Sequence, residues 1–467
     1  MIKEINEKLK KGEITSKDLI EESFNKIKAN KELNAFVTIK ENHTEPKIET
    51  LLSGIPTSIK DNISTKDMLT TASSKLLKDY IPAFDATVVS KLKDAGAVII
   101  GKNTMDELGM GGTGLNAATG IVKNPHNLNK KIGGSSSGSA AAVAAGIVPY
   151  SIASDTGDSI CKPASLSGIV GYKPTYGMIS RYGLISFASS LDTIGVFANS
   201  VEDASIVVDH IKGKDDFDMT TFESSNINLH KSLKEDLKGN KLFYIKEICD
   251  IENYENKSDE LIESLNNFKN KINLYKENGF EITEISIDKN LIKAIFPAYM
   301  IISSSEAVSN TANLTGILFG NRNDKETVEE TIIDFRNNLS SQVKTRLITG
   351  AYSLSKDNYE ELYLNATKVR NLIVKEIKSL FNKYDAMMLP ASLEPATDLE
   401  YKAEGYLKTE QHLAIANFGG FPSITIPSGI VSNMPVGINL TSNIMEDEKL
   451  LNIAYNLEKL KDVKSWI

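Results

Sequence analysis

The sequence predicts an α/β protein in which a mixed β-sheet is covered by helices on both faces, folded as a single domain. Two observations carry this prediction. Short apolar segments alternate with helical patterns between residues 54 and 201, and strand-like segments return between residues 386 and 440. Strands that alternate with helices are typical of a parallel or mixed sheet between helical layers. Neither an internal repeat nor a low-complexity linker is visible, so we expect one domain over residues 51–467 with residues 1–50 as its helical scaffold.

The N-terminal part begins with helices and continues with short strands. The first 30 residues read as two amphipathic helices, and Thr15-Ser16-Lys17-Asp18 is a capping-box-like start for the second. Beyond residue 54, glycine turns separate short apolar segments. This pattern predicts a helix over Thr87–Lys93 and strands over Ala97–Gly101, Val148–Ser154 and Ile169–Lys173.

The remaining part is polar at first and regains apolar strands near its end. Residues 203–275 are rich in Lys, Asp, Glu and Asn, which predicts surface structure with a solvated helix over Asp259–Asn278. The periodicity beyond them predicts two helices, three strands and a closing helix, in the order Ala298–Ala312, Tyr359–Asn382, Ala386–Pro390, Ser423–Pro427, Val436–Leu440 and Asp447–Leu460.

Composition and charge favour a cytoplasmic enzyme without a metal. Apolar residues make up 41% of the chain and charged residues 24%, which is ordinary for a globular protein with a sizeable core. The net charge of −8 argues against strong binding of a phosphate backbone by this chain alone. Two cysteines support no disulfide framework, and five scattered histidines lack metal-ligand spacing. We see no signal peptide and no uncharged apolar segment of about 18 residues, so a membrane span is not expected.

Two serine-rich turns and one lysine indicate acyl-transfer chemistry. Ser159 closes the segment Asp155–Ser159, and Gly133–Ser139 lies upstream, with no histidine in either. A serine nucleophile needs a base for its proton, and a lysine can serve where burial lowers its pKa. Lys60 follows an apolar stretch and has isoleucine neighbours, which favours partial burial over a solvated charge. The sequence therefore predicts a serine–lysine enzyme that acts on amides without a metal.

Two glycine-rich stretches imitate nucleotide-binding motifs. Gly109–Gly114 fits the dinucleotide pattern GxGxxG but lacks the strand–turn–helix context that this motif needs. Gly133–Gly138 has the glycine spacing of a phosphate loop, with Ser139 where the lysine belongs. Nucleotide binding by this chain is therefore not expected.

An acyl-transfer site also needs backbone amides aimed at the developing oxyanion, and glycine-containing turns supply them. The small-residue helix Ser139–Gly146 would present unpaired amides at its start, although serines at a helix start are usually caps. We assign the oxyanion hole instead to the turn beside the nucleophile, with the amides of Thr156, Gly157, Asp158 and Ser159.

Three blocks of the chain resemble the amidase-signature hydrolases: Gly54–Asn62, Gly133–Gly146 and Asp155–Pro174. The spacing of Lys60, Ser135 and Ser159 is similar to the family's pattern of lysine, bridging serine and nucleophilic serine. By this resemblance Ser159 is the nucleophile, Ser135 relays its proton and Lys60 is the final base. The resemblance also implies the family's fold, a mixed sheet between helices.

Within that family the chain most resembles the glutamine-hydrolysing A subunits of tRNA-dependent amidotransferases, over about residues 5–460. The sequence segments that carry this resemblance include Asp85–Val89, Met105–Glu107, Lys173–Gly177 and Ser180–Gly183. It implies that glutamine is hydrolysed and that its ammonia passes to a partner, which converts Glu-tRNA(Gln) to Gln-tRNA(Gln). The activity would be that of a glutamine-hydrolysing glutaminyl-tRNA synthase, a heterotrimer with B and C subunits.

The same resemblance assigns ligands. This chain would bind no cofactor, while the partner subunit would use ATP and Mg²⁺ and receive the misacylated tRNA. Arg346 would hold the α-carboxylate of glutamine in a bidentate pair, and Tyr299 and Glu410 would contact its α-amino end.

The chain departs from the family pattern beside the nucleophile. Asp158 stands where a second glycine is usual, and Cys161 replaces an arginine. In the serine-rich segment Gly133–Ser139, which we call the serine loop, Ser137 replaces the middle glycine. Cys161 with neighbouring Lys162 is a weaker candidate nucleophile. Two alternatives therefore stay open: a stand-alone amidase for another small amide, and a catalytically weakened assembly protein in which Asp158 and Cys161 have disabled the site.

Overall fold

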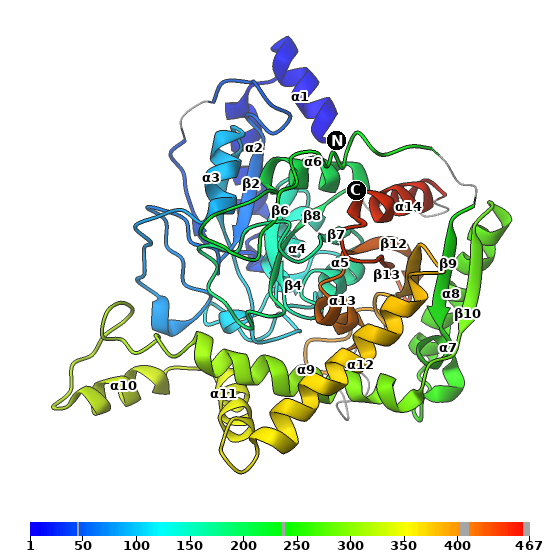
Figure 1. Cartoon of the computed structure of the whole chain (residues 1–467). Coiled ribbons are helices and arrows are strands. Elements are labelled where there is room, and N and C mark those ends of the chain that lie inside the picture. The colour runs from blue at the N-terminus through cyan, green and yellow to red at the C-terminus, as the bar shows by residue number, and fades with distance from the viewer. Residues whose placement is uncertain (44–45, 236–238, 402–410, 461–467) are drawn as a thin grey trace.

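The computed structural model describes residues 1–43, 46–235, 239–401 and 411–460. Within these residues an eleven-stranded sheet forms the centre of the molecule, in the order β1-β3-β2-β6-β8-β7-β12-β13-β11-β9-β10 (Figure 1). Its strands are β1 (Phe36–Ile39), β2 (Pro56–Lys60), β3 (Val98–Asn103), β6 (Tyr150–Asp155), β7 (Val170–Lys173), β8 (Thr193–Ala198), β9 (Lys241–Ile245), β10 (Glu281–Ile285), β11 (Ala386–Pro390), β12 (Ser423–Val431) and β13 (Met434–Thr441).

The sheet is mixed, as the sequence predicts. Strand β2 runs parallel to β3 and β6, and β9 runs parallel to β10 and β11. The other neighbouring strands are antiparallel, including the long β12–β13 hairpin. A separate two-stranded ribbon is formed by β4 (Lys123–Asn124) and β5 (Asn127–Lys131).

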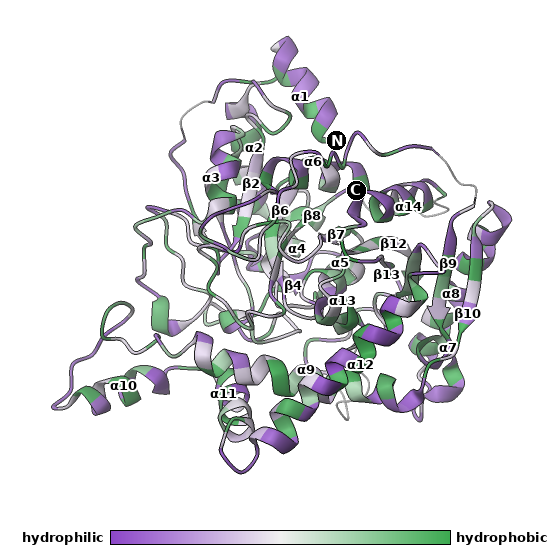
Figure 2. Ribbon diagram, in the orientation of Figure 1, coloured by the Kyte–Doolittle hydropathy of each residue, from purple (hydrophilic) through white to green (hydrophobic). Residues whose placement is uncertain are grey.

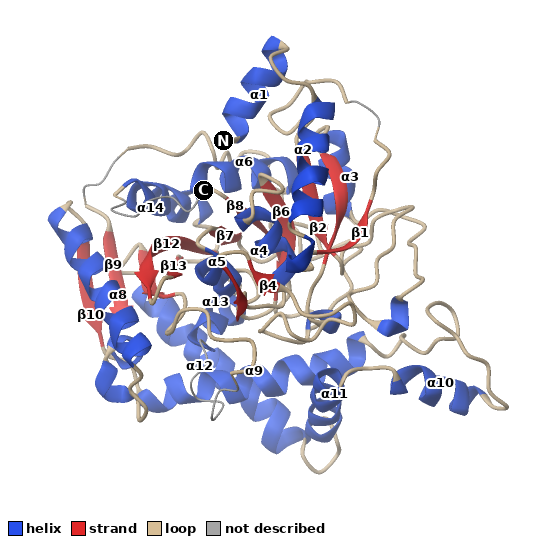
Figure 3. Ribbon diagram, turned by 180° about the vertical axis from the view of Figure 1, so that it is seen from behind, coloured by secondary structure: helices blue, strands red, loops and turns tan. Residues whose placement is uncertain are grey.

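Helices surround this sheet (Figure 3). They are α1 (Ile2–Lys11), α2 (Ser16–Ala29), α3 (Thr87–Asp94), α4 (Ser137–Ala144), α5 (Cys161–Ser167), α6 (Val201–Ile211), α7 (Lys246–Cys249), α8 (Asp259–Glu277), α9 (Lys289–Asn310), α10 (Val328–Asn337), α11 (Ser341–Ser353), α12 (Asn365–Leu380), α13 (Ala414–Gly419) and α14 (Asp447–Lys459). Helices α9, α11 and α12 pack on one another and form a helical layer beside the strands (Figures 1 and 3).

Alternation along the central strands separates two apolar cores. Ile152 of β6 and Val196 of β8 belong to the large core that also contains Ala204 of α6. Their neighbours Ala153 and Phe197 belong to a second core, built with α4 and α2. Successive side chains of a strand point to opposite faces, so α6 and α4 cover the two faces of the sheet. Figure 2 shows the corresponding hydrophobic residues gathered in the central strands and α4.

The N-terminal helices join these cores. Ile2 and Leu9 of α1 lie in the large core, and Ile20 of α2 lies in the second. The predicted capping box is present: Thr15 Oγ1 accepts a hydrogen bond from the Asp18 amide at 3.1 Å, and Asp18 Oδ2 accepts one from the Thr15 amide at 2.8 Å.

Three predicted elements differ from the structure. The helix expected over Ala298–Ala312 is the second half of α9, which continues through Pro297, because packing against α11 and α12 compensates for the amide that proline lacks. The helix expected from Tyr359 begins as a π-helical turn before α12. The polar segment 203–275 is not all surface structure, since it contains the buried strand β9 and most of the buried helix α6.

One helix in the described part of the chain is long and apolar enough to cross a membrane by length and composition: α9. It buries Ile295 and Ile302 in the large core and packs against two other helices. The core helix of a globular protein meets the same criteria, so this helix is explained by its packing.

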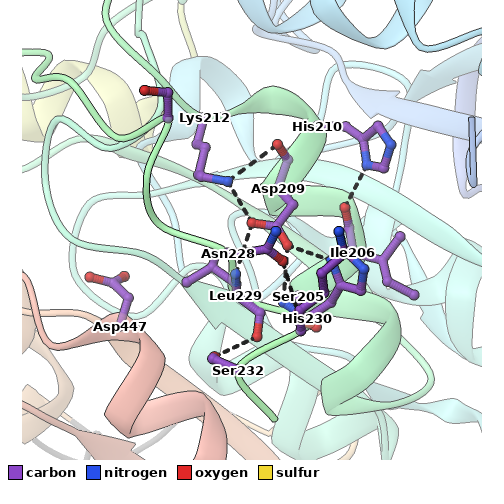
Figure 4. A network of polar contacts seen from close by, with 12 residues as sticks. Ser205, Ile206, Asp209, His210, Lys212, Asn228, Leu229, His230, Ser232 and Asp447 are labelled. Carbon is purple, nitrogen blue, oxygen red and sulfur yellow. Dashed lines mark hydrogen bonds and ion pairs between the residues drawn. The ribbon is translucent and has the colours of Figure 1, made fainter.

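A partly buried carboxylate on α6 holds the long connection that leads towards β9. Asp209 accepts hydrogen bonds from the backbone amides of Leu229 and His230, from His230 Nδ1 at 2.7 Å and from Lys212 Nζ at 2.5 Å (Figure 4). Burial opposes ionisation of Asp209, but the hydrogen bonds from His230 and Lys212 outweigh it and lower its pKa below the ordinary 3.8. The ionised side chain therefore stabilises this connection at neutral pH.

Candidate active site

Lys60 ends strand β2 and is fully buried. Its Nζ donates to Ser135 Oγ at 2.8 Å, to Ser136 Oγ at 2.8 Å and to the carbonyl oxygen of Ser154 at 2.9 Å. Burial lowers the pKa of Lys60 to about 7, although the carboxylate of Asp155 favours the charged form. A substantial fraction of Lys60 is thus neutral near pH 7, the state in which an amine can accept a proton.

Ser135 connects this lysine to Ser159. The Ser135 hydroxyl donates to Ser159 Oγ at 3.0 Å, and both side chains are buried. Ser135 follows a cis peptide bond from Gly134, just before α4, whereas Ser159 lies between β6 and α5. The three residues that the sequence singles out therefore form one continuous hydrogen-bonded chain.

The turn Thr156–Ser159 is shaped by its neighbours. Asp155 Oδ2 accepts the amide of Ile160 at 2.6 Å, which closes the turn into α5. A Cβ atom on Gly157 would lie 2.7 Å from the Tyr299 ring, so that position accepts no side chain. The backbone of the turn at Gly157 therefore lies directly against the Tyr299 ring.

Two of the three residues expected to bind substrate lie beside this turn. Arg346 of α11 has its guanidinium 5.8 Å from the Tyr299 ring and 5.7 Å from the Phe187 ring, and Nη1 is 3.5 Å from Ser303 Oγ. Burial raises the pKa of Tyr299, so its hydroxyl stays protonated at neutral pH. The structure thus brings a cation and a phenol together at the turn. Glu410, the third expected residue, lies outside the described residues.

Asp158 and Cys161 have different surroundings. Asp158 is half-buried. Its Oδ2 atom is close to Gly112: a Cβ atom added to Gly112 would lie 3.8 Å from it. Cys161 is buried with Sγ 3.6 Å from Ser423 Oγ, and burial raises the pKa of its thiol to about 12. A thiol protonated at neutral pH is a poor nucleophile, so this geometry gives no support to Cys161 as the attacking group.

The glycine-rich segment Gly109–Gly114 serves a structural purpose. Asp106, which is fully buried, accepts the amides of Thr113, Gly114 and Asn116, and its own amide donates to the carbonyl of Ser135. This carboxylate holds the segment against the serine loop. Sequence reasoning used Asp106 as part of a resemblance and missed this contact, although a glycine-rich segment with many free amides requires a nearby acceptor.

Residues that fix the other side of the site were also missed. Asp192 accepts the hydroxyl of Thr156 at 2.7 Å, and Asn417 donates to Asp155 Oδ1 at 3.0 Å. No local motif distinguishes these side chains from other buried polar residues. Among the residues that the structure describes, no cluster of three or more His, Cys, Asp and Glu side chains is placed to hold a metal ion.

Comparisons with known proteins agree with this geometry. The family model named Amidase matches residues 18–451. The A subunit of the glutamyl-tRNA(Gln) amidotransferase from Thermoanaerobacter pseudethanolicus is 38% identical, over 98% of this chain and 96% of that protein. The protein of the same name from Bacillus pumilus is 37% identical, over 99% of this chain and 97% of that protein.

Solved structures show the same architecture. The A subunit of the glutamyl-tRNA(Gln) amidotransferase from Thermotoga maritima matches with a TM-score of 0.80 and 33% identity, covering 96% of this chain and 94% of that chain. The peptide amidase of Stenotrophomonas maltophilia matches with a TM-score of 0.82 and 25% identity, covering 98% and 96%. From its fold and from relatives that match along almost its full length, the chain belongs to the amidase signature family.

Proposed function

We propose that this amidase hydrolyses the side-chain amide of glutamine as the A subunit of a tRNA-dependent amidotransferase. The observation that carries the proposal is the unbroken hydrogen-bonded chain Lys60–Ser135–Ser159, with Arg346 nearby against the Tyr299 ring that contacts the turn. The curated relatives at 37–38% identity, which are named as such subunits, support the same substrate.

The resting hydrogen bonds run from Lys60 to Ser135 and from Ser135 to Ser159, and the proposed proton transfer runs in the opposite direction once Lys60 is neutral. Ser159 Oγ attacks the amide carbon while its proton passes to Ser135 Oγ, and the Ser135 proton passes to neutral Lys60. The amides of the turn Thr156–Ser159 stabilise the oxyanion of the tetrahedral intermediate. Collapse of the intermediate breaks the C–N bond, and the amide nitrogen takes a proton back from the relay and leaves as ammonia. Water then hydrolyses the glutamyl ester on Ser159 by the same steps and releases glutamate.

Arg346 and its neighbours select the substrate in this proposal. A guanidinium holds a planar carboxylate through two parallel hydrogen bonds, which suits the α-carboxylate of glutamine. Tyr299 and Glu410 would contact the α-amino group. Asp158, which interacts electrostatically with Tyr299, would contribute a further negative charge near that phenol.

The remaining parts of the proposal concern assembly. Residues 51–467 would form one amidase domain with residues 1–50 as its helical scaffold, in the cytoplasm. B and C subunits would complete a heterotrimer, and the partner would bind the misacylated tRNA, ATP and Mg²⁺ and convert Glu-tRNA(Gln) to Gln-tRNA(Gln). A net charge of −8 supports this division, because it leaves this chain poorly suited to hold tRNA.

A stand-alone amidase for another small amide is the second candidate. The likeness to the Stenotrophomonas maltophilia peptide amidase favours it, since the TM-scores of the two kinds of relative are almost equal. A panel of amides that includes glutamine separates these two candidates. Labelling of Ser159 by a serine-directed reagent separates both from a catalytically weakened assembly protein.

Replacing Ser159 by alanine should reduce ammonia release from glutamine by about 10⁴-fold or more, to background, because this hydroxyl is the proposed nucleophile. Circular dichroism should show an unchanged fold. Ser139→Ala is a matched control, since Ser139 is a buried serine of the same loop region whose hydroxyl bonds Asn103 outside the relay. Activity that survives in Ser159→Ala at the parental level would remove Ser159 from the mechanism.

The rate should depend on pH through Lys60. Its pKa of about 7 predicts that kcat/KM rises tenfold per pH unit below pH 7 and levels off above it, because the neutral amine is the active form. Lys60→Ala and Ser135→Ala should each be severely impaired, and the double variant should lose little more than either one, since the relay acts as a unit. Fully multiplied losses in the double variant would contradict a shared relay.

Arg346→Ala should lower kcat/KM for glutamine by about 10- to 100-fold, mainly through KM, because a charge-assisted bidentate contact is lost. Hydrolysis of butyramide, which lacks the α-carboxylate, should change far less. Lys344→Ala is the control, since this lysine of α11 bonds the Asn337 carbonyl away from the pocket. Equal losses on both amides would place Arg346 outside substrate recognition.

Assembly should raise the activity. Purified chain should release ammonia slowly, and addition of B and C subunits with misacylated tRNA and ATP should raise the rate severalfold, a coupling of about 1–3 kcal/mol. Ammonia release with and without these additions is the measurement. Co-purification from the native cell identifies the partners, and full activity that is insensitive to them would favour the stand-alone amidase.

A further inference from the structure

One buried carboxylate connects the turn beside Ser159 to the loop that contains Phe187. Asp192 is 2% exposed and precedes β8. Its Oδ1 accepts the Thr156 hydroxyl at 2.7 Å, and its Oδ2 accepts the amides of Phe187 at 2.9 Å and Ala188 at 3.1 Å. The turn that contains the oxyanion donors is thereby tied to residues 187–192, which we call the Phe187 loop.

Asp155, which precedes Thr156 at the same end of the turn, is tied to the same loop. Asn417 of α13 donates from Nδ2 to Asp155 Oδ1 at 3.0 Å and to the carbonyl of Leu191 at 3.1 Å. The start of the turn and the Phe187 loop are therefore connected at two points, one through Thr156 and one through Asp155. These two attachments fix the start of the turn more firmly than a single hydrogen bond would.

The Phe187 loop also contacts Arg346, the residue proposed to bind the substrate carboxylate. The Phe187 ring lies against the Arg346 guanidinium at 5.7 Å. Further along the loop, Ser190 donates from its amide and its hydroxyl to Glu306 of α9 at 2.8 and 2.6 Å, and Arg370 of α12 donates to the Ser190 hydroxyl at 2.8 Å. The loop is thus fixed to the helical layer that carries the expected substrate contacts.

We propose that Asp192 is a positioning residue that couples the substrate pocket at Arg346 to the oxyanion turn. It holds the backbone amides of Thr156–Ser159 in register with the Phe187 loop, so that a substrate seated against that loop meets aligned oxyanion donors. This inference rests on the proposed reaction at Ser159. Its physical basis is that a displacement of about 1 Å in a catalytic group costs on the order of 100-fold in rate.

The charge on Asp192 is part of this arrangement. Burial raises the pKa of Asp192 to about 6, against the hydrogen bond from Thr156 and the positive charge of Arg181. Lys60, Tyr176 and Tyr299 also interact with it electrostatically. Above pH 6 the ionised carboxylate accepts all three hydrogen bonds, and below pH 6 the added proton removes an acceptor.

Two variants of Asp192 separate positioning from simple structural support. Asp192→Ala removes every acceptor, and we expect kcat and the rate at which a fluorophosphonate labels Ser159 to fall on the order of 100-fold. In Asp192→Asn the amide oxygen can face the Phe187 and Ala188 amides while its NH₂ donates to Thr156 Oγ1, so at pH 8 most of both rates should be recovered.

Asp209→Ala is the matched control. Asp209 is a partly buried carboxylate that also accepts two backbone amides, but on α6 in the network of Figure 4. It should lower the unfolding temperature about as much as Asp192→Ala and leave kcat and Ser159 labelling unchanged. Thr156→Val should lower both rates, and adding it to Asp192→Ala should cause little further loss, since both remove the same contact.

The pH profile gives an independent readout. Protonation of Lys60 below pH 7 gives log kcat a slope of one, and the Asp192 carboxylate favours the charged lysine. Asp192→Asn removes this negative charge and keeps the hydrogen bonds, so the midpoint of its pH profile should lie at a lower pH than that of the parent. Parental rates in Asp192→Ala, or the same midpoint in the parent and Asp192→Asn, would overturn the inference. Failure of the parent Ser159 to react with the fluorophosphonate would instead refute the proposed reaction itself, and failure to hydrolyse glutamine would refute the substrate alone.

Discussion

The site depends on the burial of one amine. Lys60 has no access to water, so each of its N–H groups must find an oxygen inside the protein, and the three oxygens within reach belong to Ser135, Ser136 and the Ser154 carbonyl. Desolvation disfavours the ammonium form and shifts the pKa to about 7. The same burial that makes the lysine a base therefore also dictates where the serine loop must lie, because an unpaired donor at this depth would destabilise the fold.

The carboxylates around the site limit how far that shift goes. Asp155, Asp106 and Asp192 all favour the charged lysine, and all three are buried. These groups remain because their oxygens accept backbone amides: Ile160 for Asp155, three amides of the glycine-rich segment for Asp106, and the Phe187 loop for Asp192. These carboxylates stabilise loops that contain many amide donors. They raise the pKa of Lys60 because those loops lie beside it.

The sequence predicted those elements that depend on residues close to one another along the chain. Strands β3, β6, β7, β11, β12 and β13, the mixed sheet and the spacing of Lys60, Ser135 and Ser159 follow from apolar segments and glycine turns read along the chain, whereas β8 was not predicted. Strand β9 was missed because Lys and Asn flank its few apolar residues, and its burial comes from β10 and β11, which lie far along the sequence. The role of Asp192 was invisible for a related reason: its partner Thr156 is 36 residues away, and nothing near either residue indicates the contact.

The turn beside Ser159 shows how a departure from the family pattern can leave the geometry intact. Gly157 must lack a side chain because Tyr299 occupies the space above it. Asp158 stands where relatives of this kind have a second glycine, yet its backbone is not among the residues with positive φ, so a side chain fits there without strain. What changes is the charge. The Asp158 carboxylate adds to the groups that favour protonated Lys60, and it is close enough to Tyr299 to raise the pKa of that phenol. A negative charge at this point would oppose a developing oxyanion and would attract a substrate ammonium group.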